Sequence, residues 1–306
     1  MQVNQALAPD IEAFLGQFPL TTLDDEILAT RRATPMPTVP LSDAVTRTEH
    51  VVPGDPPVPV RVHRAADAGG AQPGVVSIHG GGMVIGSYAQ DDPLWDRWCP
   101  KLGVTAVAVD YRLAPETRYP GALEDCYAAL VWTHEHADEL GIDAARIGVR
   151  GVSAGGGLAA GLALLARERG GPALAFQLLD CPMIDDRQQT PSSRLEGLAV
   201  WSKGSNTYGW RAYLGDLYGS DDVPATAAPA RATDLSGLPP AFVSVGSVDG
   251  FRDEDVDYAL RLNQAGVPCE LHVYPGAPHG YALAPTSEVS KQSNRDMVAW
   301  LARQLA

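Results

Sequence analysis

Short β-rich runs alternate with helix-length segments along most of this chain, and this alternation restricts the fold more than any other feature. The strand-like runs lie at residues 58–63, 74–79, 104–110, 147–150, 174–179, 241–245 and 270–274. The main helix-length segments lie at residues 122–140, 154–169, 253–265 and 287–305. Strands separated by helices pair in parallel through right-handed crossovers. The pattern therefore predicts an α/β fold in which a central, mostly parallel sheet is flanked by helices.

One interval is too long for an ordinary connection between two elements. About 60 residues separate the strand-like run that ends at residue 179 from the run that starts at residue 241, and loops of that length usually carry a function or structure of their own. Apolar and aromatic side chains recur through residues 184–225, enough for a helix or two with one side facing the core. We expect these residues to form an inserted cap on a core made of residues 45–183 and 226–306.

The first 44 residues differ in pattern from the core. Two short amphipathic segments, at residues 11–18 and 23–31, precede a stretch with prolines at positions 35, 37 and 40. Proline fixes the backbone angle φ and stiffens the chain. We expect residues 1–44 to form the N-terminal part of the same helical cap, joined to the core by a stiff linker.

Composition and charge exclude several classes of protein and partner. A chain of 306 residues, 45% hydrophobic and 20% charged, can bury a sizeable core. Its formal net charge of −14 repels phosphate backbones and anionic lipid headgroups, so we expect no nucleic-acid partner. The longest apolar stretch, residues 157–166, is about half the roughly 20 residues that cross a bilayer. We expect no membrane span.

The N-terminal residues and the cysteines lead to two further expectations. Residues 1–10 lack the basic region and the apolar run of a signal peptide, which predicts a cytoplasmic location. The cysteines at positions 99, 126, 181 and 269 match neither a metal knuckle nor a redox pair. We expect them to be buried free thiols, and we expect no cofactor and no bound metal.

Residues 151–155 read Gly-Val-Ser-Ala-Gly and join a strand-like run to a helix-length segment. A tight strand-to-helix turn of this kind strains the serine backbone and lifts the hydroxyl above the sheet, and small neighbours leave room for the turn. Ser153 is therefore a candidate nucleophile. The plain alternative is a glycine-rich turn that only packs a helix on the sheet.

Residues 79–82 read His-Gly-Gly-Gly at the end of another strand-like run. Successive glycines let backbone N–H groups approach a substrate oxygen, and such donors stabilise the oxyanion of a tetrahedral intermediate in acyl transfer. A flexible turn is the structural alternative. A phosphate-binding loop is set aside because no Gly-Lys-Ser or Gly-Lys-Thr follows.

Two later residues could complete a catalytic triad with Ser153. Asp249 lies just beyond the run at residues 241–245, and His279 lies in a loop after the last run. α/β-hydrolases place their triad in the chain order serine, acid, histidine. Taken singly, an aspartate after a strand usually caps a turn and a histidine usually bonds locally. The joint order favours a triad.

Five motifs together resemble the bacterial hormone-sensitive-lipase-like esterases, a family with the α/β-hydrolase fold. They are HGGG at 79–82, DYRLAPE at 110–116, GVSAGG at 151–156, DGFRDE at 249–254 and HGY at 279–281. The resemblance runs from about residue 45 to the C-terminus. It implies that Ser153 is the nucleophile, His279 the base and Asp249 the acid that orients the base.

The resemblance also implies an oxyanion hole made by the N–H groups of Gly81, Gly82 and Ala154. Two positions depart from the family pattern. Val152 stands where the family usually has Asp, Glu or Thr, and Gly250 replaces a proline in the motif of the acid. The second change removes stiffness from that loop and leaves Glu254 as a minor rival to Asp249.

These motifs predict a serine hydrolase that acts on carboxylic esters through an acyl-enzyme. The same triad acting on an amide, carbamate or lactone is the alternative, because the carbonyl chemistry is shared. A non-catalytic small-molecule receptor on this scaffold is a third reading, and the presence of His279 argues against it.

Three apolar residues are candidates for the substrate pocket, namely Met83, Trp201 and Trp210. A closed pocket lined by them would suit short acyl groups, as the resemblance also implies, although the two tryptophans could instead pack into a small core of the cap. The expected partner is a small-molecule ester. The sequence allows a homodimer but does not specify one.

Overall fold

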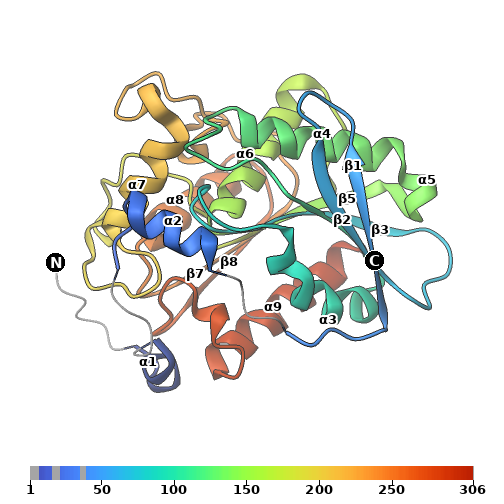
Figure 1. Cartoon of the computed structure of the whole chain (residues 1–306), viewed down its shortest axis with the longest axis horizontal. Coiled ribbons are helices and arrows are strands. Elements are labelled where there is room, and N and C mark those ends of the chain that lie inside the picture. Colours follow the sequence, from blue (N-terminus) through green and yellow to red (C-terminus); the bar gives the residue numbers. More distant parts are fainter. Residues whose placement is uncertain (1–6, 16–20, 35–38, 306) are drawn as a thin grey trace.

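One eight-stranded sheet runs through the molecule, with strand order β1-β2-β4-β3-β5-β6-β7-β8. The structure is a computed structural model that describes residues 7–15, 21–34 and 39–305 (Figure 1). The strands are β1 (Val45–Val52), β2 (Val58–Ala65), β3 (Gln72–Ile78), β4 (Thr105–Val109), β5 (Ile142–Val152), β6 (Gln177–Asp180), β7 (Ala241–Gly246) and β8 (Cys269–Tyr274).

The sheet is mostly parallel, which confirms the predicted fold class. Strands β3 to β8 pair with one another in parallel. Strand β2 pairs antiparallel with both β1 and β4. Strand β1 was not predicted, because its central residues Thr46, Arg47, Thr48 and Glu49 form no apolar run. An edge strand that faces solvent can be polar throughout its centre.

Helices cover both faces of the sheet. The helices of the core are α3 (Asp92–Leu102), α4 (Gly121–Glu135), α5 (Ala137–Leu140), α6 (Ala154–Arg169), α8 (Arg252–Gln264) and α9 (Glu288–Gln304). Successive side chains of β3 face opposite sides of the sheet, so that Val76 and Ile78 belong to the core that includes α4, α6 and α8, and Val75 belongs to the core on the other face, which includes α3 and α9. In Figure 1, α4 and α6 lie on the opposite side of the sheet from α3 and α9.

Two helical predictions need correction. Residues 122–140 were expected to be one helix, but the structure has two, which meet at His136, where φ is −105° and ψ is 17°. Helix α3 was not predicted, because prolines occupy its N-terminal turn and its interior at Pro100. Its buried aromatic residues Trp95 and Trp98 explain why the helix forms, since packing outweighs weak local propensity.

Three further helices come from the two segments expected to form a cap. These are α1 (Pro9–Leu15), α2 (Asp25–Ala33) and α7 (Lys203–Leu214), and short 3₁₀ turns lie at Tyr88–Asp91, Ser192–Arg194, Gly215–Leu217, Pro229–Arg231 and Tyr281–Leu283. The two segments contact each other, because the hydroxyl of Tyr208 donates to Asp25 at 2.7 Å and the N–H of Leu23 donates to the hydroxyl of Ser205 at 3.0 Å. Figure 1 shows α2 beside α7.

Some predicted positions lie outside the described residues, namely Phe18, Pro35 and Pro37. Within the described residues, no helix is both long enough and apolar enough to cross a membrane.

Candidate active site

Ser153 stands at a sharp turn between β5 and α6. Its backbone angles, φ 57° and ψ −121°, belong to a region that non-glycine residues rarely adopt. The neighbouring glycines are required by space: a Cβ on Gly151 would lie 2.0 Å from the carbonyl oxygen of Gly155, and a Cβ on Gly155 would lie 2.1 Å from the carbonyl oxygen of Ile78. The sequence Gly-Val-Ser-Ala-Gly thus makes this turn sterically feasible.

His279 connects Ser153 to Asp249. The imidazole Nε2 lies 2.9 Å from the Ser153 hydroxyl oxygen, and Nδ1 lies 2.8 Å from a carboxylate oxygen of Asp249. The ring of Phe251 meets the imidazole edge-to-face, with centroids 4.8 Å apart. The structure therefore brings the three predicted residues together in a single hydrogen-bonded line, although they come from three separate turns at the carboxyl edge of the sheet.

Asp249 contacts His279, and its rival Glu254 does not. The second oxygen of Asp249 accepts the N–H of Phe251 at 2.9 Å, which fixes the orientation of the carboxylate. Glu254 lies in the first turn of α8 and is buried, and its carboxylate makes no hydrogen bond to the described residues. Burial raises the pKa of Glu254 well above its usual value, and the nearby charges of Asp185 and Asp249 raise it further. The nearby backbone of Asp185 and Ile184 offsets part of this rise in pKa.

The glycine loop after β3 leaves N–H groups unpaired beside Ser153. Gly81 has φ 120° and Gly82 has φ 62°, both in the region that favours glycine. Neither N–H donates to a described residue, and Ala154 begins α6, where the first N–H groups have no partner within the helix. Gly80 lies close to the serine, since a Cβ added there would lie 3.4 Å from the Cβ of Ser153. These free donors are available to an oxygen of a bound substrate.

The base of this loop is anchored by His79, which belongs to the same motif. Its Nδ1 donates to the carbonyl of Gly80 at 2.8 Å, and its ring stacks on Tyr111 with centroids 4.2 Å apart. The hydroxyl of Tyr111 in turn donates to the carbonyl of His79 at 3.0 Å. Burial lowers the pKa of His79. A neutral, buried imidazole in this position holds the loop and does not face Ser153.

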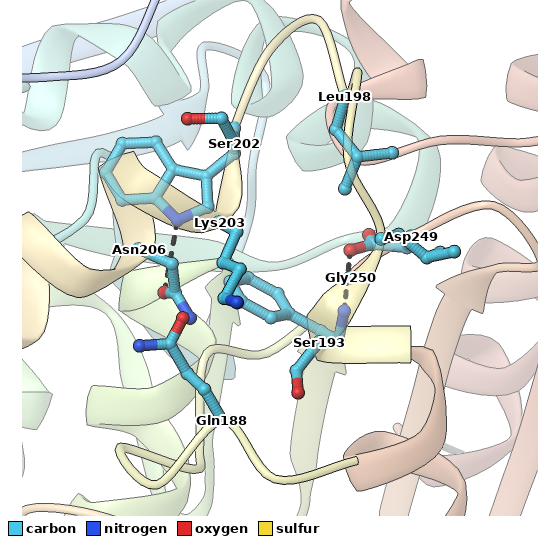
Figure 2. A pocket seen from close by; sticks show the side chains of 11 residues that line it. Gln188, Ser193, Leu198, Ser202, Lys203, Asn206, Asp249 and Gly250 are labelled. Carbon is cyan, nitrogen blue, oxygen red and sulfur yellow. Dashed lines mark hydrogen bonds between the residues drawn. The ribbon is translucent and has the colours of Figure 1, made fainter. Parts of the chain in front are cut away.

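Trp201 connects the loop of glycines to a pocket beside the site. A Cβ on Gly82 would lie 2.0 Å from Cη2 of Trp201, so the indole packs directly on this glycine. The indole N–H donates to Asn206 at 3.2 Å (Figure 2). The pocket holds about 250 Å³ of space including its open mouth, and its lining includes Trp201, Leu198 and Asp249. Ser153 and His279 do not line it.

The other two candidates for the pocket lie deeper. Trp210 is fully buried in the main core, where its ring packs near Tyr213. Met83 is also buried in this core, with φ 64°. Neither residue lines the pocket of Figure 2.

Sequence reasoning did not single out Cys181, Phe251 or Asn206, although each lies beside a predicted site residue. Cys181 directly follows β6 and is within 4.8 Å of Asp249 and His279, measured between possible ligand atoms. One signal was available for Cys181, since the carboxyl ends of parallel strands converge at the same edge of a sheet. No comparable signal exists for Asn206, which depends on how α7 packs.

A family model described as the α/β-hydrolase fold matches residues 75–283. The chain belongs to this family. The hydrolase is 42% identical to carboxylesterase NlhH of Mycobacterium tuberculosis (strain ATCC 25618 / H37Rv) over 227 residues, which cover 73% of this chain and 71% of the relative. It is 37% identical to esterase LipI of the same strain over 238 residues, covering 74% and 72% of the two chains.

A solved structure of a bacterial heroin esterase superposes with a TM-score of 0.90 at 41% identity, covering 98% of both chains. The resemblance to bacterial hormone-sensitive-lipase-like esterases is confirmed by these relatives.

Proposed function

We propose that this hydrolase is a serine carboxylesterase that cleaves short-chain acyl esters through an acyl-enzyme. One observation carries the proposal: the line from Ser153 through His279 to Asp249, with contacts of 2.9 and 2.8 Å. Relatives named as esterases and carboxylesterases support the choice of ester over amide, carbamate or lactone. A receptor without activity is disfavoured, because the nucleophile and the base are already within hydrogen-bonding distance.

In the first half of the reaction, His279 Nε2 takes the proton of Ser153 as the hydroxyl oxygen attacks the acyl carbonyl. The imidazolium then gives this proton to the departing alcohol. Asp249 accepts a hydrogen bond from Nδ1, which keeps Nε2 free to accept the serine proton and stabilises the charged ring. In the second half, water attacks the acyl-enzyme and His279 repeats both transfers.

We assign the oxyanion hole to the N–H groups of Gly81, Gly82 and Ala154. Ala154 follows Ser153 in the chain, the glycine loop comes close to Ser153 at Gly80, and the three N–H groups make no hydrogen bond to described residues. Backbone donors held in place before the reaction stabilise the developing negative charge without further reorganisation. Trp201, seated on Gly82, would then border the acyl group and limit its length.

We also propose that residues 1–44 and 184–225 act together as the cap over a catalytic core of residues 45–183 and 226–306. The hydrogen bonds that Asp25 in α2 and Leu23 just before it make with α7 support this division. Helix α2 also reaches the core, since Arg32 pairs with Glu116 at 2.7 Å and donates to the carbonyl of Ala114 at 2.7 Å. A cap fixed at these points would close the site over a bound ester.

Ser153→Ala tests the proposal. Hydrolysis of p-nitrophenyl esters graded from acetate to decanoate should be fastest for the short chains in the wild type, and should fall by several orders of magnitude in the variant. Circular dichroism and thermal unfolding provide the control, because the variant should fold normally. A well-folded variant that keeps more than about a tenth of the wild-type rate would contradict the role of Ser153.

A cytoplasmic location and a homodimer are further proposals. The described cysteines are all free thiols, which suits a reducing compartment. Cell fractionation tests the location.

Light scattering coupled to size exclusion tests the dimer, for which a mass near 65 kDa is expected, about twice the 32.4 kDa of the chain.

A further inference from the structure

Cys181 lies beside the proposed triad without taking part in it. Its Sγ, a carboxylate oxygen of Asp249 and a ring nitrogen of His279 all lie within 4.8 Å of one another, and all three residues are buried. Among the described residues, Cys181, Asp249 and His279 are the one group of three His, Cys, Asp or Glu side chains whose possible ligand atoms lie close enough together to hold a metal ion. The backbone of Cys181 is fixed, because its N–H donates to the carbonyl of Ser244 at 2.6 Å.

The donor set suits a borderline or soft divalent cation. Zinc takes thiolate sulfur at about 2.3 Å and imidazole nitrogen or carboxylate oxygen at about 2.0–2.2 Å. In a tetrahedron, these bond lengths place the donor atoms about 3.5 Å apart. The donor atoms, which lie within 4.8 Å of one another, would therefore draw closer together when the metal binds. Calcium and magnesium prefer oxygen ligands, so the thiol disfavours them.

The charges around Cys181 also favour a cation. Burial raises the pKa of its thiol, and the carboxylates of Asp180, Asp249 and Asp255 raise it further. The Asp249 carboxylate, which is itself one of the three proposed ligands, supplies negative charge that attracts a divalent cation. Arg150 lies near Asp180 and offsets part of this field.

We propose that Cys181, Asp249 and His279 form an inhibitory binding site for zinc or a similar thiophilic divalent cation. The Cys181 thiol releases its proton to solvent and binds the metal as a thiolate. If the metal binds Nδ1 of His279, the single proton of the neutral ring moves to Nε2, which can then no longer accept the proton of Ser153. If the metal binds Nε2, the base is occupied directly. Either geometry stops the reaction.

The pocket of Figure 2 borders the proposed site at Asp249. Asp249 lines this pocket together with Gly250 and Phe251. A cation that entered this pocket would meet Asp249, one of the three proposed ligands.

Cadmium binding tests the site independently of activity, since a cadmium–thiolate bond produces an ultraviolet charge-transfer band. We expect the wild-type protein to develop this band on titration with Cd²⁺, and Cys181→Ser and Cys181→Ala to lose it. Cys269→Ala, which changes the half-buried cysteine far from the triad, should keep the band. Absence of the band in the wild type, or its persistence in both Cys181 variants, would overturn the proposal.

Inhibition is measured on p-nitrophenyl acetate, with each variant compared with its own rate without metal. Zinc should inhibit the wild type reversibly, with recovery on EDTA, and the Cys181 variants should need at least about tenfold more zinc. If zinc inhibited the wild type and the Cys181 variants at the same concentration, the inhibitory role of this site would be contradicted. The inhibition, unlike the binding, rests on the proposed function. Ser153→Ala separates the two, because it should lose turnover yet bind Cd²⁺ as the wild type does.

Discussion

Asp249 and Glu254 are two buried acids five positions apart, yet only Asp249 meets His279. The difference lies in backbone geometry. Asp249 occupies the turn after β7, where its carboxylate also accepts the N–H of Phe251, whereas Glu254 is already in the first turn of α8 and lies near Asp185. A triad acid acts by orienting the imidazole, so contact with the ring is the property that matters.

Asp249→Asn should therefore lower kcat on the order of 10⁴-fold, because an amide can favour the wrong tautomer of His279. Glu254→Gln, the matched control, should change kcat by less than about tenfold, since it touches neither the ring nor the nucleophile. Steady-state kinetics of both variants on one short-chain ester provides the measurement. A larger loss at Glu254 than at Asp249 would reverse the assignment of the acid.

At the scale of an element, the start of α8 carries an electrostatic cost. Asp255 is fully buried, and its carboxylate makes no hydrogen bond to the described residues. Burial raises its pKa well above the usual value, and the neighbouring charges of Glu254, Asp249 and Asp180 raise it further. The folded protein thus holds a proton that the unfolded chain releases at lower pH. The stability that this group contributes is present at acid pH. It is lost as the pH rises from the pKa of Asp255 in the unfolded chain toward its raised pKa in the folded protein.

Asp255→Asn should raise the free energy of unfolding at neutral pH, because it removes the proton that folding must take up. Between the pKa values of the unfolded and folded states, one such group lowers the free energy of unfolding by about 1.4 kcal/mol for each pH unit. The gain over the wild type should shrink as pH falls and vanish below about pH 4, where the unfolded chain is also protonated. Urea unfolding of both proteins between pH 4 and 8 measures this. A gain that does not change with pH would contradict the explanation.

The segment that leads into α7 controls the space above Gly82. Trp201 rests on this glycine, and Asn206 in the first turns of α7 holds its indole N–H. Trp201→Ala should therefore open room for longer acyl groups, shifting kcat/KM from p-nitrophenyl acetate toward the octanoate by about tenfold or more.

The matched control is Trp210→Phe, since Trp210 is buried in α7, the helix that follows Trp201, but does not line the pocket. It should lower the melting temperature and leave the order of acyl preference unchanged. An identical chain-length profile in Trp201→Ala and wild type would show that Trp201 does not limit the substrate.

At the scale of the whole molecule, parallel strands bring the site together. Strands β3, β5, β7 and β8 all end at the same edge of the sheet, so residues that follow each of them meet there: the glycine loop, Ser153, Asp249 and His279. The proposed reaction needs only these groups and the backbone donors. No step in it calls for a cation.

EDTA should therefore leave ester hydrolysis unchanged in protein purified without added metal. The measurement is the initial rate on p-nitrophenyl acetate before and after prolonged chelation, with a zinc hydrolase as the positive control for the chelator. Loss of activity with EDTA and its recovery with zinc would contradict a reaction based on backbone donors.

The sequence by itself determined the fold class and the chain order of the candidate residues. Apolar runs with a period of two or 3.6 and the glycines around Ser153 are local signals, since each depends on the backbone within a few residues. This is why the parallel part of the sheet, helix α6 and the turn at Ser153 could be predicted. Strand β1 and helix α3 could not, because their local patterns are weak and packing decides them.

Only the tertiary structure decided which distant side chains touch. It placed Asp249 rather than Glu254 on His279, seated Trp201 on Gly82, and put the thiol of Cys181 within reach of Asp249 and His279. These contacts join residues far apart in the chain. Such distances follow from how helices and loops settle on the sheet, which no local pattern of residues specifies.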